Sequence, residues 1–107
     1  MDSMITGFPS PAQGYEDKAI DLNSLLVRHP AATVFMQIDT TRYTRIGIYS
    51  GDLLIVDRAL ELTPQSLVIY ESEGEFRIGK VALLKDHNVN VCGTITNVIH
   101  SVSYGWR

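Results

Sequence analysis

The sequence predicts a mainly β fold with one short helix near its N-terminus. From Thr33 onward, β-branched and aromatic residues dominate, and turn residues recur about every eight to twelve residues, a pattern typical of all-β domains. A chain of 107 residues can bury one hydrophobic core but has no room for two. We therefore expect one β domain.

Residues 1–19 are predicted to form an extended arm, because helix and strand breakers alternate there with scattered apolar residues. These breakers are Gly7, Pro9, Pro11 and Gly14. The domain itself is then expected to span residues 20–107.

A short helix of about two turns is predicted to follow, with Asp21 as its N-cap. Its apolar residues share one face at helical spacing and are Leu22, Leu25 and Leu26. The helix should end before Pro30, because the residue preceding a proline is disfavoured in helical conformation.

Five strands are predicted after the helix, and they are Thr33–Ile38, Leu53–Val56, Leu67–Tyr70, Phe76–Leu84 and Asn88–Val98. Gly51–Asp52 and Glu73–Gly74 supply turns between them, since glycine tolerates positive φ and aspartate can bond its own backbone. The run Leu53–Val56 is apolar on both faces and should lie inside the sheet. Ile95–Val102 fits neither periodicity, but its Thr, Val and Ile content favours a strand.

Composition excludes several classes of function. The net charge of −3 and the pI near 5.5 leave no Lys/Arg-rich face, so direct nucleic-acid binding is not expected. No stretch approaches the roughly 20 apolar residues of a membrane span, and no signal peptide is recognisable. Cys92 is the single cysteine, which excludes an intrachain disulfide and is expected to fill the core. We expect a soluble, cytoplasmic protein.

No cofactor or metal site is predicted. His29, His87 and His100 lack further ligands at zinc-site spacing, so surface or capping roles are expected, and a Ser/His/Asp triad built on His100 has only common residue types in its favour. No glycine-rich phosphate loop is present. Tyr104 and Trp106 near the C-terminus are candidates for packing on the domain or docking on a partner.

Three stretches give the chain a family resemblance, and they are Gly7–Tyr15 (GFPSPAQGY), Ile20–Thr33 (IDLNSLL running into HPAAT) and Gly51–Asp57 (GDLLIVD) with Gly74–Phe76 further on. Together they resemble the UmuD branch of the LexA-type, S24 peptidase-like proteins. The resemblance implies a LexA-type C-terminal β domain that forms a homodimer, or a heterodimer with a UmuD-like relative. It also implies partnership with a Y-family DNA polymerase in SOS mutagenesis, the error-prone bypass of DNA damage.

The resemblance further implies a catalytic pair, a serine activated by an unprotonated lysine. Counting back without gaps from Gly51 places the serine position on Arg42, and counting on from Gly74 places the lysine position on Gly79. Neither residue can perform the expected role. The chain is therefore predicted to be a pseudo-peptidase without catalytic residues.

An alternative keeps the activity by relocating the pair to Thr41 as nucleophile and Lys80 as base. Strand side chains alternate, so Lys80 points to the opposite face from residue 79 unless a bulge shifts the register. Gly79 makes a bulge conceivable, since glycine within a strand often marks one. A relocated peptidase thus stays an open alternative.

Two further departures from the family concern the N-terminus and the segment between Leu84 and Val89. Family precursors carry an arm that ends at a Cys-Gly or Ala-Gly bond, whereas six residues precede Gly7, so the chain resembles the processed form, UmuD′. Between Leu84 and Val89 the family usually has a longer connecting segment, whereas this chain has only Lys85–Asn88 there. The leading hypothesis is a non-catalytic UmuD′-like subunit; a regulatory decoy that dimerises with a LexA-like or UmuD-like protein is a third possibility.

Overall fold

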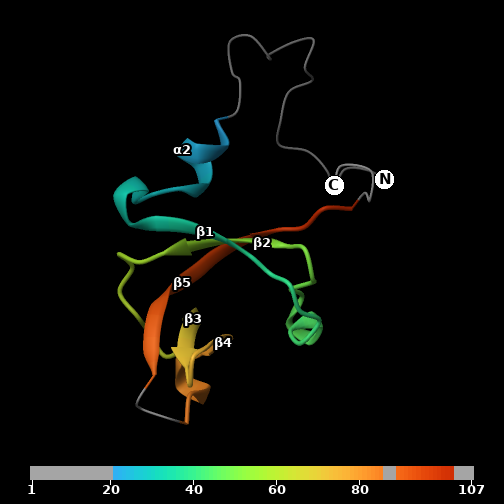
Figure 1. Cartoon of the computed structure of the whole chain (residues 1–107). Helices are drawn as coiled ribbons and strands as arrows, with labels where there is room; N and C mark the ends of the chain where they lie inside the picture. The colour runs from blue at the N-terminus through green and yellow to red at the C-terminus, as the bar shows by residue number, and fades with distance from the viewer. Residues whose placement is uncertain (1–20, 86–88, 103–107) are drawn as a thin grey trace.

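The computed structural model describes residues 21–85 and 89–102, and these form one antiparallel sheet with little helix (Figure 1). Its strand order is β1-β2-β5-β3-β4, so β1 and β4 are the two edges. The strands are β1 Thr33–Gln37, β2 Leu53–Asp57, β3 Leu67–Ser72, β4 Glu75–Lys80 and β5 Asn90–Ile99. The predicted mainly β class is confirmed. The arm expected at residues 1–19 lies outside the described residues.

Helix α2 covers Leu22–Leu26 and begins as the sequence predicts. The carboxylate of Asp21 accepts the backbone N–H of Asn23 at 3.0 Å and the hydroxyl of Ser24 at 2.9 Å. The Ser24 hydroxyl is the main cause of a lowered pKa of Asp21. With five residues, the helix is shorter than the two turns expected. Pro30–Ala32 then form the 3-10 helix η1, which leads directly into β1.

Strand β2 lies inside the sheet, as its apolar run predicts. It pairs with β1 on one side and with β5 on the other, and Leu54 and Val56 are completely buried. A strand covered on both faces needs apolar residues at consecutive positions, which explains why Leu53–Val56 do not alternate with polar residues. The prediction that this run lies inside the sheet is therefore confirmed.

The predicted strand Phe76–Leu84 is wrong at its C-terminal end. The strand stops at Lys80, and Val81–Leu83 form the 3-10 helix η3. The N–H of Val81 donates to the carbonyl of Ser66, and the N–H of Ala82 donates to that of Pro64. These two bonds hold Val81 and Ala82 against the loop that precedes β3, so the chain turns away from the strand. Apolar residues continue through the turn, so composition alone could not mark where pairing ends.

Strand β5 confirms strand structure for most of the ambiguous tail, ending at Ile99. Its register shifts opposite Ile55/Val56 and again opposite Ile69/Tyr70. Such irregularities increase the local twist of a sheet, and they explain why the apolar spacing of this segment fits no single period. The predicted start at Asn88 lies outside the described residues.

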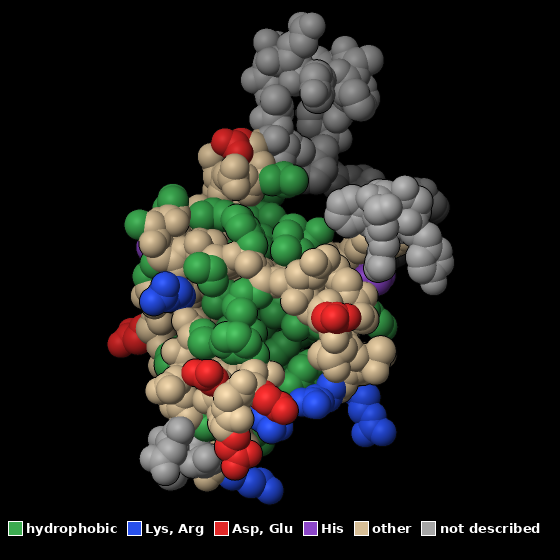
Figure 2. Space-filling view, viewed as in Figure 1, with side chains coloured by type: hydrophobic (Ala, Val, Ile, Leu, Met, Phe, Trp, Pro, Cys, Tyr) green, Lys and Arg blue, Asp and Glu red, His purple; other side chains and the backbone are tan. Residues whose placement is uncertain are grey.

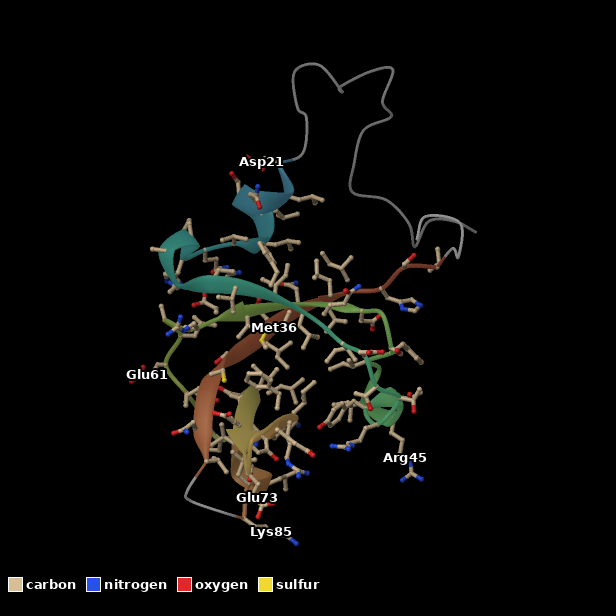
Figure 3. All side chains as sticks on the ribbon, viewed as in Figure 1. Asp21, Met36, Arg45, Glu61, Glu73 and Lys85 are labelled. Carbon is tan, nitrogen blue, oxygen red and sulfur yellow. The ribbon has the colours of Figure 1, made fainter. Side chains whose placement is uncertain are left out.

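The hydrophobic core gathers on one face of the sheet, and its buried members are Ile38, Ile48, Leu54, Val56, Ile69, Ile78 and Ile95. Met36, labelled near the middle of Figure 3, packs against this cluster from β1. Hydrophobic side chains form a band over the middle of the face seen in Figure 2. Gly93 allows the strands to lie close, because a Cβ at this position would stand 2.7 Å from Val56 Cγ1.

Candidate functional site at the edge of the sheet

The chain that carries Arg42 lies against the edge strand β4. Tyr43 packs onto the core, and its hydroxyl oxygen accepts the backbone N–H of Ile78 at 3.2 Å. Ile78 directly precedes Gly79, while Tyr43 directly follows Arg42. The fold therefore brings together the two segments in which the resemblance places the nucleophile and the base.

Local hydrogen bonds hold the segment around Arg42 in a compact turn. The N–H of Arg42 donates to the hydroxyl of Thr40 at 3.2 Å, and the hydroxyl of Thr44 donates to the carbonyl of Thr41 at 2.8 Å. The 3-10 helix η2, Thr44–Ile46, follows and ends where Gly47 adopts a left-handed conformation. Arg42 is exposed, and Figure 3 shows Arg45 projecting away from the sheet. Both arginines of this turn thus lie at the surface and not in the core.

Gly79 lies on the face of β4 opposite to Ile78, because strand side chains alternate. A Cβ built at this position would lie 3.6 Å from both Tyr70 Cε1 and Leu84 Cδ2, which is ordinary van der Waals contact. A longer side chain could therefore start here without a clash. Apolar neighbours of this kind favour the uncharged form of an amine. The position suits a base lysine, although this chain has none there.

The alternative pair, Thr41 and Lys80, is not joined by a hydrogen bond within the part of the chain that the structure describes. Lys80 is exposed, with its Nζ 3.5 Å from Gln65 Oε1. Pairing of β3 with β4 runs without interruption from Leu67↔Lys80 to Ser72↔Glu75. The bulge that would turn Lys80 to the face of Gly79 is thus absent from this pairing.

A histidine–aspartate pair that the sequence did not reveal links the end of β5 to the start of β2. His100 Nδ1 lies 2.7 Å from Asp52 Oδ1, and the other carboxylate oxygen accepts the N–H of Tyr49 at 2.8 Å. Asp52 is only 1% exposed, and the ring of His100 lies 5.1 Å from that of Tyr49. Because Leu53 pairs with Ile99, the strand register sets these two residues side by side.

A second such pair joins the chain before β1 to the end of β2. His29 Nδ1 lies 2.6 Å from Asp57 Oδ2, while Asp57 Oδ1 accepts the N–H of Ala59 at 2.8 Å. The hydrogen bond to His29 lowers the pKa of the Asp57 carboxyl; burial opposes it, and the bond from Ala59 adds to it. In each pair the aspartate also bonds a nearby backbone N–H. Their geometry suits a structural clamp.

Other predicted features contribute little to a site. Cys92 is partly buried and packs against the core, as expected of a filling residue. Within residues 21–85 and 89–102, no cluster of three His, Cys, Asp or Glu side chains could hold a metal ion, and no helix is long and apolar enough to cross a membrane. His87, Tyr104 and Trp106 lie outside the described residues.

Comparison with known proteins identifies the family. Residues 1–92 match the model of the Peptidase S24-like family. The chain is 34% identical to Protein ImpA of Salmonella typhimurium and Escherichia coli, an alignment that covers 92% of this chain and 80% of the relative.

Protein SamA of Salmonella typhimurium and Protein MucA of Escherichia coli are each 40% identical over 72% of this chain. These two alignments cover 55% of SamA and 53% of MucA. The three relatives are UmuD-like SOS mutagenesis proteins. With a family model over most of its length and a relative aligned over nearly all of it, this chain belongs to the Peptidase S24-like family, among the UmuD-like SOS mutagenesis proteins.

Proposed function

We propose that this protein is a non-catalytic UmuD-like accessory subunit. In this proposal it dimerises with itself or with a UmuD-like relative, and it binds a Y-family translesion DNA polymerase during SOS mutagenesis. Family membership supports the role in mutagenesis. One observation supports the loss of catalysis: the hydrogen bond between Ile78 and Tyr43 brings Arg42 and Gly79 to the same edge of the sheet.

The chemistry of the two positions explains why cleavage is not expected. Attack on a peptide bond needs a hydroxyl or thiol and a neutral base within hydrogen-bond reach. The guanidinium of Arg42 stays protonated in proteins and has no nucleophilic oxygen, while Gly79 has no side chain. The phenol of Tyr43, the residue after Arg42, already accepts a backbone hydrogen bond. Lys80 remains exposed on the other face of β4.

Restoring the pair tests this assignment. The double variant Arg42→Ser, Gly79→Lys should gain cleavage of a UmuD-like precursor at mildly alkaline pH, because the apolar contacts of position 79 favour a neutral lysine. Arg42→Ser, Gly79→Met is the matched control, since methionine provides similar bulk without an amine. The wild-type chain should leave the precursor intact at every pH, as followed by gel electrophoresis. Cleavage by the wild-type protein would show that it is a peptidase.

Binding to the polymerase needs its own experiment. A tagged copy of the cognate Y-family polymerase should retain the wild-type chain, either as a homodimer or mixed with its UmuD-like relative. An unrelated protein of similar size serves as the control for nonspecific retention. If neither form of the protein is retained, the accessory role is wrong, whatever the outcome of the cleavage assay.

A further inference from the structure

A polar cavity of about 370 Å³ opens between helix α2, the end of β2 and the C-terminal half of β5. This volume falls in the range of small-molecule sites, roughly 300–1,000 Å³. Glu61, labelled in Figure 3, marks the loop after β2 that contributes to the lining. The apolar part of the lining consists of Leu25, Leu26 and Leu60, and the polar part of Arg28, Asp57, Thr96 and Asn97.

The cavity is separate from the edge that carries Arg42 and Gly79. None of its lining residues comes from β4 or from the turn around Arg42. Small-molecule sites commonly combine apolar groups with a few polar groups that fix the orientation of the ligand. The lining therefore has the composition of a binding site of its own.

A β-bulge in β5 brings two polar residues into this lining. Asn97 pairs with Ile55, whereas Ile95 pairs with Val56, so Thr96 is an extra residue without a partner in β2. The hydroxyl of Thr96 donates to the carbonyl of Ile55 at 3.3 Å, which fixes the irregular segment. Bulges are frequent beside functional sites, where they redirect side chains. The irregularity of β5 thus coincides with the cavity.

Two side chains of the lining carry donors that the described residues leave without a partner. The carboxamide of Asn97 is half-buried, and the guanidinium of Arg28 is exposed; neither forms a side-chain hydrogen bond or an ion pair within residues 21–85 and 89–102. A carboxamide offers two N–H donors and a guanidinium five. Both groups are therefore available to an anionic group of a ligand.

Asp57 adds a buried negative charge to the same lining. The residue is only 4% exposed, and its carboxylate accepts hydrogen bonds from His29 and from the backbone N–H groups of Ala59 and Leu60. An ionised carboxylate has about four acceptor positions, so one remains for a further donor. The cavity thus combines a cation, an amide and an anion with apolar groups.

We propose that this cavity binds a free apolar α-amino acid. The guanidinium of Arg28 and the carboxamide of Asn97 donate to its carboxylate, and its ammonium group donates to the remaining acceptor position of Asp57. Its side chain packs against the three leucines. Guanidinium groups suit carboxylates because both are planar and form two parallel hydrogen bonds.

The combination of charges favours a free amino acid over a peptide end. A peptide N-terminus has the ammonium group but no neighbouring carboxylate, and a C-terminus has the carboxylate but no ammonium. Either would leave one charged group of the cavity without a partner. A free amino acid supplies both charges on one carbon atom, together with the apolar side chain.

Leucine and two of its derivatives test the ligand. Titration of L-leucine into the 15N-labelled chain should shift the side-chain amide signals of Asn97 saturably in NMR spectra. Leucinamide lacks the carboxylate, and N-acetylleucine lacks the ammonium group. Each should bind about tenfold or more weakly than leucine, because each loses one charge-assisted contact.

A pair of arginine variants tests the site. Arg28→Gln should weaken leucine binding by about tenfold or more, because a neutral amide replaces the charge-assisted pair. Arg58→Gln is the matched control, since Arg58 is also exposed and directly follows Asp57, but it does not line this cavity. This control should bind leucine like the wild type. Thermal unfolding verifies that both variants fold.

The outcomes decide between the possible ligands. No saturable shift at millimolar leucine, or equal binding of leucine and both derivatives, would overturn the proposal. Tighter binding of leucinamide or of N-acetylleucine would assign the cavity to a peptide N-terminus or C-terminus instead. Leucine binding that Arg28→Gln leaves unchanged would place the ligand elsewhere. The polymerase and cleavage assays do not enter this test, so the proposed function stands or fails separately.

Discussion

The two edge strands of the sheet, β4 and β1, differ in their contacts and in their residue types. At β4, the buried side chain of Ile78 faces the core, and its N–H is taken by the hydroxyl of Tyr43. At β1, the central Phe35 is exposed, and the strand pairs only with β2 among the described strands. β4 also carries charged residues, and β1 carries none. One edge thus forms a hydrogen bond with the chain that carries Arg42, whereas the other pairs with β2 alone among the described residues.

The largest difference between the edges should appear when a side chain is shortened on each. Ile78→Ala removes buried methyl groups and should lower the free energy of unfolding by about 2–4 kcal/mol. Val34→Ala on β1 should cost less than about 1 kcal/mol, because Val34 is partly exposed. Urea unfolding measures both. An equal loss of unfolding free energy in the two variants would contradict this difference between the edges.

Removing the hydroxyl that closes β4 should have an intermediate effect. Tyr43→Phe deletes the bond to Ile78 and should destabilise the protein by about 1 kcal/mol. Hydrogen exchange of the Ile78 amide should accelerate in this variant. Tyr49→Phe is the matched control, because the hydroxyl of Tyr49 forms no hydrogen bond within residues 21–85 and 89–102. Unchanged exchange at Ile78 would show that the phenol does not close this edge.

A smaller effect, limited to acidic pH, should come from the His29–Asp57 pair, which joins the chain before β1 to the end of β2. The bond from His29 lowers the pKa of Asp57, so its stabilisation is complete above the unfolded value of about 3.9 and is lost as the pH falls through the lower folded value. The free energy of unfolding should therefore fall below about pH 4. Asp57→Asn should flatten this part of the curve. An identical slope in the variant would contradict the assignment.

The smallest change concerns the hairpin that joins β3 to β4. Glu73 and Gly74 both have positive φ, at 55° and 81°, and the first is unfavourable for glutamate. Glu73→Asn should stabilise the protein by about 0.5 kcal/mol, because asparagine tolerates this conformation better. Thermal unfolding measures the gain. A loss of stability would show that Glu73 makes a compensating contact.

Much of the fold was predictable because local chemistry and tertiary context agree. Asp21 caps the helix through its own side chain, and the apolar run of β2 has one stable location, between two other strands. The end of β4 was not predictable, since Val81 leaves the strand only because Ser66 offers a carbonyl from another part of the chain. The two histidine–aspartate pairs escaped prediction for the same reason.

By itself, the sequence determined the β class, the capped helix, the apolar run that lies inside the sheet, and the residues at the positions where the resemblance expects a serine and a lysine. These properties depend on side-chain chemistry and on neighbours close along the chain. The tertiary structure alone decided that Tyr43 bonds one edge strand, that β1 forms the other edge of the described sheet, and that Asp52 lies beside His100. Such facts follow from strand order and register, which residues distant in the sequence establish only when the sheet has formed.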